Sequence, residues 1–246
     1  MNESDTATTL DRFYRGALTL HQPKYGYRFS IDAVLLAVLA CPRPGDLVID
    51  LGTGCGVVAL LLARRDETLT IYGVELQAEL AQLARQNVVS NRLEERVHVL
   101  EDDINTLEAK RFPRPADLIV ANPPYYRLTS GRLNPNDQRA IARHELRLTL
   151  AQLLGAARSL LRTGGRLVCV YASERLADLL SGMRRMGIEP KQLRMVHGRA
   201  KEDARLCLVE GVQQGRPGLK VGPPLVIYTD EGAYTDTLQQ YFDLYG

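Results

Sequence analysis

The chain has 246 residues, 45% of them hydrophobic, and a formal net charge of only +2. This length can bury a full core in one domain, or in one domain with a small extension, and the near-neutral charge argues against a tight, non-specific nucleic-acid binder. No apolar stretch reaches the ~18 residues that cross a membrane, and the first residues lack the basic and apolar regions of a signal peptide. The dispersed cysteines, without a C-x-x-C pair, indicate reduced thiols of a cytoplasmic protein.

The first helix signal is the apolar run Ala33–Leu39, which Ser30 or Asp32 can cap. From residue 46 onward, strand and helix signals alternate. Expected strands are Asp46–Leu51, Thr70–Leu76, Val97–Leu100, Asp117–Ala121, Arg166–Tyr171, Leu193–His197 and Leu206–Val212, with a short one at Leu225–Tyr228. Expected helices are Val57–Arg65, Ala78–Asn91, Leu148–Arg162, Glu174–Met186 and Tyr234–Tyr245, and Gly164-Gly165 is expected to stop the third of them. The alternation predicts an open, mostly parallel α/β sheet that binds ligands at the carboxyl ends of its strands.

Polar and glycine signals follow the first three of these strands. Asp50-Leu51-Gly52-Thr53-Gly54-Cys55-Gly56 lies between a strand and a helix, where alternate glycines allow a tight turn and close approach of a ligand. Glu75 ends the second strand, where a carboxylate can accept hydrogen bonds from a ribose diol. Asp103 follows the third strand and can accept from an adenine amine, while Ile104 can pack on the ring. Taken alone, a glycine turn is commonly a plain strand–helix connection, and an acid at a strand end is commonly solvated. The order of these signals along the chain favours one nucleoside site.

Asn122-Pro123-Pro124-Tyr125 ends the fourth expected strand. The two prolines favour extended backbone and remove two N–H donors, so the carbonyl of Pro123 is not paired in a ladder. The Asn122 side-chain oxygen and this carbonyl can therefore accept hydrogen bonds from one planar NH2 group. Tyr125 offers a ring on which a flat substrate can stack. These residues predict a site that holds an exocyclic amine.

The chain resembles the class I methyltransferases that use S-adenosylmethionine in the order of its motifs, which is D-L-G-x-G-x-G, E, D-D-I and N-P-P-Y. The resemblance implies a Rossmann-like fold with a seven-stranded, mostly parallel sheet flanked by helices. It also implies that Asn122, Pro123 and Tyr125 are catalytic, and that S-adenosylhomocysteine is the product. The residues that would bind the cofactor are Asp50, Gly52, Thr53, Gly54, Gly56, Glu75, Leu76, Asp103, Ile104 and Asn122. Among them, Glu75 would hold the ribose hydroxyls and Asp103 the adenine amine.

A closer resemblance covers nearly the whole chain. Three stretches are similar to bacterial tRNA adenine-N6 methyltransferases, which act beside the anticodon of a valine tRNA. They are the segment from Gln22 to Ala33, the stretch Asn122-Pro123-Pro124-Tyr125-Tyr126 and the triplet Ala204-Arg205-Leu206. We therefore expect methyl transfer to adenine N6 in RNA, with tRNA as the leading substrate. Residues 1–45 would be an N-terminal segment and helix that cover the cofactor site, and 46–246 the methyltransferase domain with a short C-terminal extension.

A basic rim beside the catalytic loop is the candidate RNA contact. It consists of Tyr126, Arg127, Arg139, Arg143 and Arg147, the last three at four-residue spacing on one face if Asp137–Leu150 is helical. A plain solvated helix face is the alternative for this arginine row. The four histidines have no metal-ligand spacing, so we expect no metal, and no membrane partner either.

Several rival functions stay open. Protein-glutamine methylation uses the same planar amide and the same N-P-P-Y, but the enzymes that act on release factors carry a larger N-terminal domain than the 49 residues before Asp50. A guanine-N2 rRNA methyltransferase would more often have Phe in place of Tyr125. A DNA adenine methylase would need a target-recognition insertion, which is not seen. A cofactor-binding RNA chaperone without turnover is the non-enzymatic alternative, and the intact Asn122 argues against it.

Overall fold

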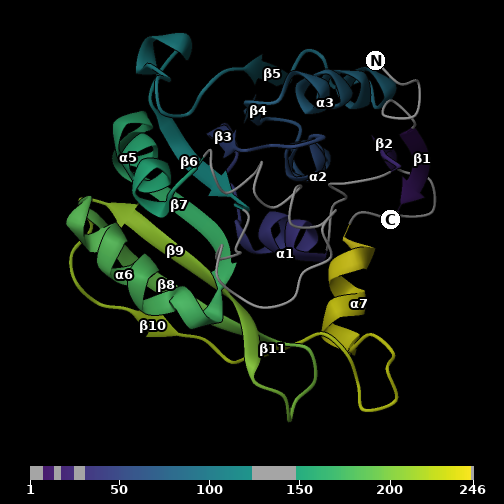
Figure 1. Ribbon diagram of the computed structural model, residues 1–246, viewed down its shortest axis with the longest axis vertical. Helices are drawn as coiled ribbons and strands as arrows, with labels where there is room; N and C mark the ends of the chain where they lie inside the picture. The colour runs from purple at the N-terminus through teal and green to yellow at the C-terminus, as the bar shows by residue number, and fades with distance from the viewer. Residues whose placement is uncertain (1–7, 14–17, 25–30, 124–147, 245–246) are drawn as a thin grey trace, which may run out of the picture.

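A mostly parallel sheet with helices on both faces forms the centre of the computed structural model, which describes residues 8–13, 18–24, 31–123 and 148–244 (Figure 1). All seven strands expected from the main alternation are present. They are β3 (Leu47–Leu51), β4 (Thr70–Glu75), β5 (Val97–Glu101), β6 (Ala116–Ala121), β7 (Leu161–Ala172), β8 (Ile188–His197) and β9 (Ala204–Gln213). The short strand expected at Leu225–Tyr228 is present as β11 (Leu225–Val226). The described part of the sheet has nine strands rather than seven, because β11 and the unpredicted β10 (Lys220–Val221) both pair with β8.

The strand order is β10-β8-β9-β7-β6-β3-β4-β5. Strands β3 to β7 run parallel to one another, and β9 is antiparallel to both β7 and β8. The carboxyl ends of the five parallel strands therefore share one edge of the sheet with the carboxyl end of β8 and the start of β9. Ligands of open α/β sheets bind at this edge.

Helices bury the two faces of the sheet in separate apolar clusters. The bounds of the helices are α1 (Ile31–Leu39), α2 (Val57–Arg65), α3 (Ala78–Ser90), α5 (Leu150–Leu160), α6 (Leu176–Arg185) and α7 (Asp236–Asp243), with short 3₁₀ turns η2 (Ala109–Arg111) and η3 (Ser173–Arg175). α1, α2, α3 and α7 contribute to one cluster, and α5 and α6 to the other (Figure 1). Successive residues of β3 alternate between the clusters, because side chains of a strand point to opposite faces.

The junction between α5 and β7 differs from the prediction. Thr149 caps α5 in a reciprocal capping box with Gln152, but the helix ends at Leu160 and β7 begins at the next residue. Gly164-Gly165 thus lies inside the strand instead of stopping the helix. A Cβ at Gly165 would lie 2.9 Å from the carbonyl oxygen of Arg162 and 3.0 Å from that of Ala116. The glycine pair therefore serves a close backbone approach where the β6–β7 register shifts.

An N-terminal hairpin was not predicted. β1 (Thr8–Phe13) and β2 (Leu18–Pro23) pair antiparallel, and Leu18 and Leu20 on one face of β2 are buried in the core. In β2, buried and less buried residues alternate, but the polar residues around Leu18 and Leu20 make this pattern hard to recognise in the sequence. Within the described ranges, none of the helices has the length and apolar character required to span a bilayer.

Candidate active site

The four predicted signals come together at one edge of the sheet. Leu51 at the end of β3 pairs with Val74 on one side and with Ala121 on the other, and Glu75 pairs with Glu101. The loop after β3, the end of β4, the turn after β5 and the residues after β6 therefore lie next to one another (Figure 1). The sequence prediction of a shared crevice is consistent with this register.

The glycine loop is tightly held and needs its glycines. Gly52, Gly54 and Gly56 have φ angles of 76°, 59° and 88°, which side-chain-bearing residues rarely adopt. The N–H groups of Gly52 and Thr53 both donate to the carbonyl of Val74, at 2.9 and 3.0 Å. The loop is thereby anchored to β4, and its glycines leave no Cβ atoms in the way of a ligand.

Two carboxyl groups lie beneath this loop. Glu75 is only 6% exposed, and its two carboxylate oxygens accept from the N–H groups of Gly54 and Gln77, each at 2.9 Å. Asp50 is 2% exposed and accepts a 2.6 Å hydrogen bond from the Thr53 hydroxyl. Burial, reinforced by the nearby charge of Glu75, raises the pKa of Asp50 to about 7. The pair thus provides a buried, negatively polarised floor that suits a cationic group.

The turn after β5 presents the predicted adenine-binding residues. Asp103 accepts from both the backbone N–H and the side-chain amide of Asn105, at 2.9 and 2.8 Å through one oxygen. Ile104 is 9% exposed, and Leu76, after β4, is 37% exposed. A half-buried acid beside an apolar pair is the surface that a flat, amine-bearing ring needs.

Asn122 is half-buried and Pro123 is buried directly after β6. The other predicted substrate residues lie outside the described ranges: Tyr125, Tyr126, Arg127, Arg139, Arg143 and Arg147. Their assigned roles therefore stay predictions.

Sequence reasoning missed Asn87. This α3 residue is fully buried, and its side-chain amide donates to the carbonyls of Cys55 in the glycine loop and His21 in β2, at 2.8 and 2.9 Å. Its oxygen accepts from the His21 N–H at 2.7 Å. Asn91, one turn later, makes a matching pair of bonds with Thr19 at 2.7 and 3.0 Å. Two asparagines four residues apart, one in the last turn of α3 and one at its C-cap, were the available signal, because asparagine is a poor helix former.

The parallel sheet, the glycine loop and the acids at the strand ends define a class I methyltransferase. Residues 31–183 match the family described as the methyltransferase small domain, and the chain belongs to this family. Among its relatives, the tRNA1(Val) (adenine(37)-N6)-methyltransferase of Aeromonas hydrophila subsp. hydrophila is 32% identical over 210 residues, which cover 85% of this chain and 86% of that protein. The enzyme with the same name from Porphyromonas gingivalis is 35% identical over 158 residues, 62% of this chain and 61% of that protein. The chain thus spans about three fifths of that relative's length, and it groups with methyltransferases named for adenine N6 of tRNA.

Solved structures confirm the fold. A predicted O-methyltransferase, Atu636 from Agrobacterium tumefaciens, superposes with a TM-score of 0.70 at 22% identity and covers 87% of this chain and 97% of that one. TrmN from Thermus thermophilus has a TM-score of 0.52 at 24% identity and covers 81% of this chain and 50% of that one. The predicted Rossmann-like class I methyltransferase architecture is therefore correct.

Proposed function

We propose that this protein transfers a methyl group from S-adenosylmethionine to the exocyclic N6 of an adenine in tRNA, and that it acts in the cytoplasm. The observation that carries the proposal is the position of Asn122-Pro123, which directly follows β6 at the edge shared with the glycine loop and the Asp50–Glu75 floor. The tRNA adenine-N6 relatives support the choice of the amine.

The described residues fit this cofactor. Each carboxylate oxygen of Glu75 accepts one backbone N–H and keeps a second acceptor site, so both can still receive the hydroxyls of a ribose. Asp103 would accept the adenine amine, with Ile104 and Leu76 on the ring, and the loop from Gly52 to Gly56 would border the methionine portion near Asp50. When bound, S-adenosylmethionine supplies an electrophilic methyl group on a sulfonium.

The residues after β6 would prepare the nucleophile. An adenine amine is a poor nucleophile because its lone pair is delocalised into the ring. Hydrogen bonds from the amine to the Asn122 oxygen and the Pro123 carbonyl favour a more tetrahedral nitrogen and hold it in line for displacement. A strong general base is unnecessary, because the methylated ammonium is acidic and loses its proton afterwards. Tyr125 would stack on the base that leaves its helix.

We also propose that residues 1–45 cover the cofactor site and that 46–246 form the catalytic domain with a short C-terminal extension. The bonds of Asn87 support the covering role of the N-terminal segment, because this one side chain of α3 bonds to both β2 and the glycine loop. The arginine rim at 127–147 would contact RNA phosphates.

The test uses purified protein, tritiated S-adenosylmethionine, and either unfractionated tRNA or a release factor. We expect label in N6-methyladenosine of tRNA. Label only in protein glutamine would overturn the assignment in favour of the rival amide substrate. Asn122→Ala should abolish turnover, because its side-chain amide is assigned to the amine. It should leave the cofactor dissociation constant within about twofold, because most of the proposed cofactor contacts, those of the glycine loop, Glu75 and Asp103, remain. A large loss of cofactor affinity in that variant would contradict this role.

A further inference from the structure

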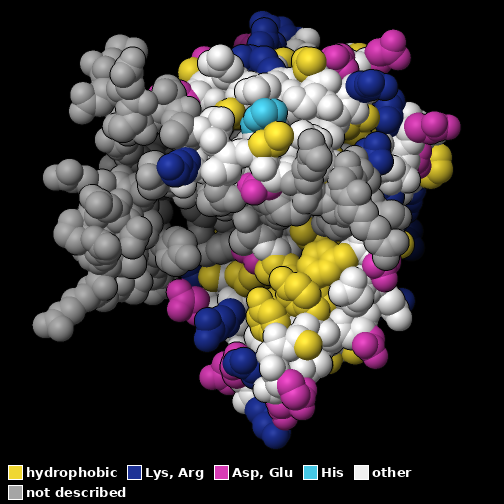
Figure 2. Space-filling view, turned by 90° about the vertical axis from the view of Figure 1, so that its right-hand side faces the viewer, with side chains coloured by type: hydrophobic (Ala, Val, Ile, Leu, Met, Phe, Trp, Pro, Cys, Tyr) yellow, Lys and Arg dark blue, Asp and Glu magenta, His cyan; other side chains and the backbone are white. Residues whose placement is uncertain are grey.

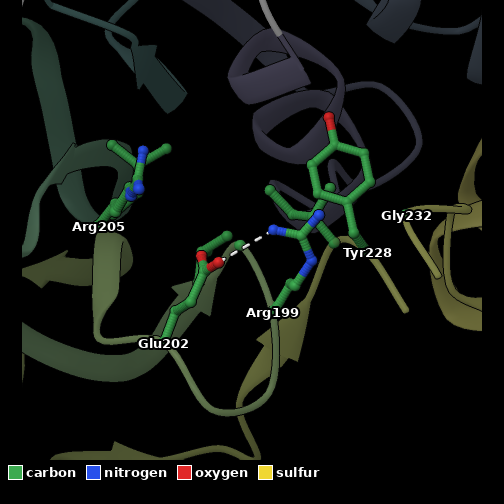
Figure 3. A pocket seen from close by; sticks show the side chains of 9 residues that line it. Arg199, Glu202, Arg205, Tyr228 and Gly232 are labelled. Carbon is green, nitrogen blue, oxygen red and sulfur yellow. Dashed lines mark hydrogen bonds and ion pairs between the residues drawn. The ribbon is translucent and has the colours of Figure 1, made fainter. Parts of the chain in front are cut away.

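A pocket of about 480 Å³ lies at the other end of the sheet from β5. Its walls come from the end of β8, the turn that leads into β9 and the residues after β11. Figure 3 shows Arg205 on one side and Tyr228 on the other, with Arg199 and its 3.1 Å ion pair to Glu202 between them. This volume is in the range of ligand-binding pockets, and none of its lining residues belongs to the candidate active site.

The pocket opens at the same edge of the sheet as the methyl-transfer site. Leu206 at the start of β9 pairs with Ala172 at the end of β7 and with Val196 at the end of β8. β7 in turn lies beside β6, which leads into Asn122. At ~4.8 Å per strand, β9 and β8 lie about 10–15 Å from β6 across the sheet. A stacked strand advances ~3.4 Å per nucleotide, so this separation corresponds to about three or four nucleotides.

The charges and rings in the pocket suit a nucleotide. Arg205 is exposed and, among the residues that the structure describes, has no acidic partner, so its guanidinium is available to a phosphate. One face of the Tyr228 ring stacks on Tyr234 at 5.4 Å between ring centroids, with an angle of 18° between the planes. This contact leaves the opposite face of the Tyr228 ring for a further flat group.

The aromatic wall is part of a larger exposed apolar region. Tyr228 and Tyr234 are 36% and 45% exposed, and Tyr234 packs edge-on against Phe242 of α7 at 5.1 Å. Hydrophobic side chains gather on the side of the molecule that carries α7 (Figure 2). Exposed tyrosines beside arginines are the combination with which proteins bind single-stranded RNA, where bases stack on rings and phosphates pair with cations.

The pocket is also held rigidly without a ligand. The N–H of Tyr228 donates to the carbonyl of Gly198 at 2.9 Å, and that of Ile227 to His197 at 3.0 Å. The turn opposite is braced by a 2.8 Å contact between the His197 ring and the carbonyl of Glu202. Because both walls are fixed, little conformational freedom is lost when a ligand enters.

We propose that this pocket holds a nucleotide of the RNA substrate a few positions from the target adenine, with its base against Tyr228 and its phosphate at Arg205 and Arg199. The proposal rests on RNA being the substrate. In it, the phosphate competes with Glu202 for Arg199, while Arg205 contributes a contact that exists only in the complex.

The first experiment compares Arg205→Gln and Tyr228→Ala with Arg216→Gln in methylation of unfractionated tRNA. Arg216 is an exposed arginine after the opposite end of β9 and is the matched control. We expect the KM for tRNA to rise about tenfold in the first two variants, with kcat and the cofactor dissociation constant nearly unchanged. In Arg205→Gln, the slope of log affinity against log salt should become shallower by about 0.7, the value for one lost phosphate contact. If both variants behave like Arg216→Gln while wild type methylates tRNA, the pocket assignment is overturned and the proposed function stands.

The second experiment measures occupancy directly. The chain contains no tryptophan, so Tyr228→Trp introduces a single indole at the proposed stacking face. Titration with a decamer of oligoadenylate should quench its fluorescence, and the added change Arg205→Gln should weaken the titration several-fold. Quenching in a protein that methylates no tRNA would refute the proposed function and the placement beside a target adenine, and would leave the pocket as an RNA-binding site only. A signal that responds to release factor but not to RNA would overturn the nucleotide assignment.

Discussion

The substitution Asn87→Ala tests whether α3 holds the glycine loop and the N-terminal hairpin in place together. It removes three hydrogen bonds of a fully buried amide, one to Cys55 and two to His21. At ~1 kcal/mol each, offset by ~0.5 kcal/mol of better helix propensity for alanine, the free energy of unfolding should fall by about 2–3 kcal/mol. Urea denaturation measures this loss.

Asn91→Ala is the matched control, because it frees the same hairpin without touching the loop. The hydrogen bonds of the Asn91 side chain go to Thr19 of β2 and to the carbonyl of Asn87, not to Cys55. Both variants should lose amide-exchange protection in β1 and β2. Only Asn87→Ala should weaken S-adenosylmethionine binding, by about tenfold, because about 1.4 kcal/mol of loop preorganisation is lost with the Cys55 bond. Calorimetric titration of the two variants gives the comparison.

Equal cofactor affinity in Asn87→Ala and Asn91→Ala would refute the reasoning, since the loop would then be fixed without the amide. A fall of less than ~1 kcal/mol in the free energy of unfolding of Asn87→Ala would also contradict the reasoning, because the freed carbonyls would then be reaching water. Replacement by aspartate is a further check: it keeps the acceptor for the His21 N–H but loses both donors. Its cofactor affinity should therefore resemble that of the alanine variant.

Three more outcomes are expected. Burial raises the pKa of Asp50 from 3.8 to about 7, so the folded state binds this proton more tightly than the unfolded state does. The free energy of unfolding should therefore fall as pH rises from about 4 to 7. Asp50→Asn should flatten this dependence in melting curves. Burial alone would raise the pKa of Asp117, but hydrogen bonds, of which the one from Arg162 has the largest effect, hold this pKa at about 2. Its stabilisation of about 2 kcal/mol should therefore be present at pH 7 and disappear between about pH 4 and 2, and Asp117→Asn should lose it with unchanged cofactor affinity. In Gly73→Ala the new Cβ would lie 2.9 Å from Thr53 atoms, so the Thr53–Asp50 bond should break, with ~1–3 kcal/mol lost in denaturation and weaker cofactor binding.

The sheet and its crevice were predictable because their signals are local. Each parallel strand is a short apolar run, and the functional residues follow the run directly, as Gly52 follows β3 and Asn122 follows β6. Chain order then determines which ends meet, since parallel strands place all their carboxyl ends at one edge. The pattern therefore indicated both the fold and the candidate residues.

The N-terminal hairpin and the nucleotide pocket were not predictable in the same way. The backbone of β2 is bonded to side chains that follow it by 66 and 72 residues, and nothing in its own sequence indicates that docking. The pocket depends on β11, a two-residue strand that lies beside β8 and brings Tyr228 next to Arg199. The sequence indicates a short strand at Leu225–Tyr228 but not its pairing with β8, so only the tertiary structure reveals which aromatic and basic groups meet. The raised pKa of Asp50 likewise depends on burial and on Glu75, which are products of the fold.

The distance in sequence between β2 and the two asparagines has a consequence for biosynthesis. A two-stranded hairpin is marginally stable alone, so β1 and β2 stay undocked until α3 has been synthesised. At ~5–20 residues per second, the 72 residues between Thr19 and Asn91 take the ribosome about 4–14 s. During this interval the buried face of β2, with Leu18 and Leu20, is exposed. β1 and β2 precede α3 in the chain and yet are secured only after it has formed, and the glycine loop acquires its Cys55 bond only when α3 arrives.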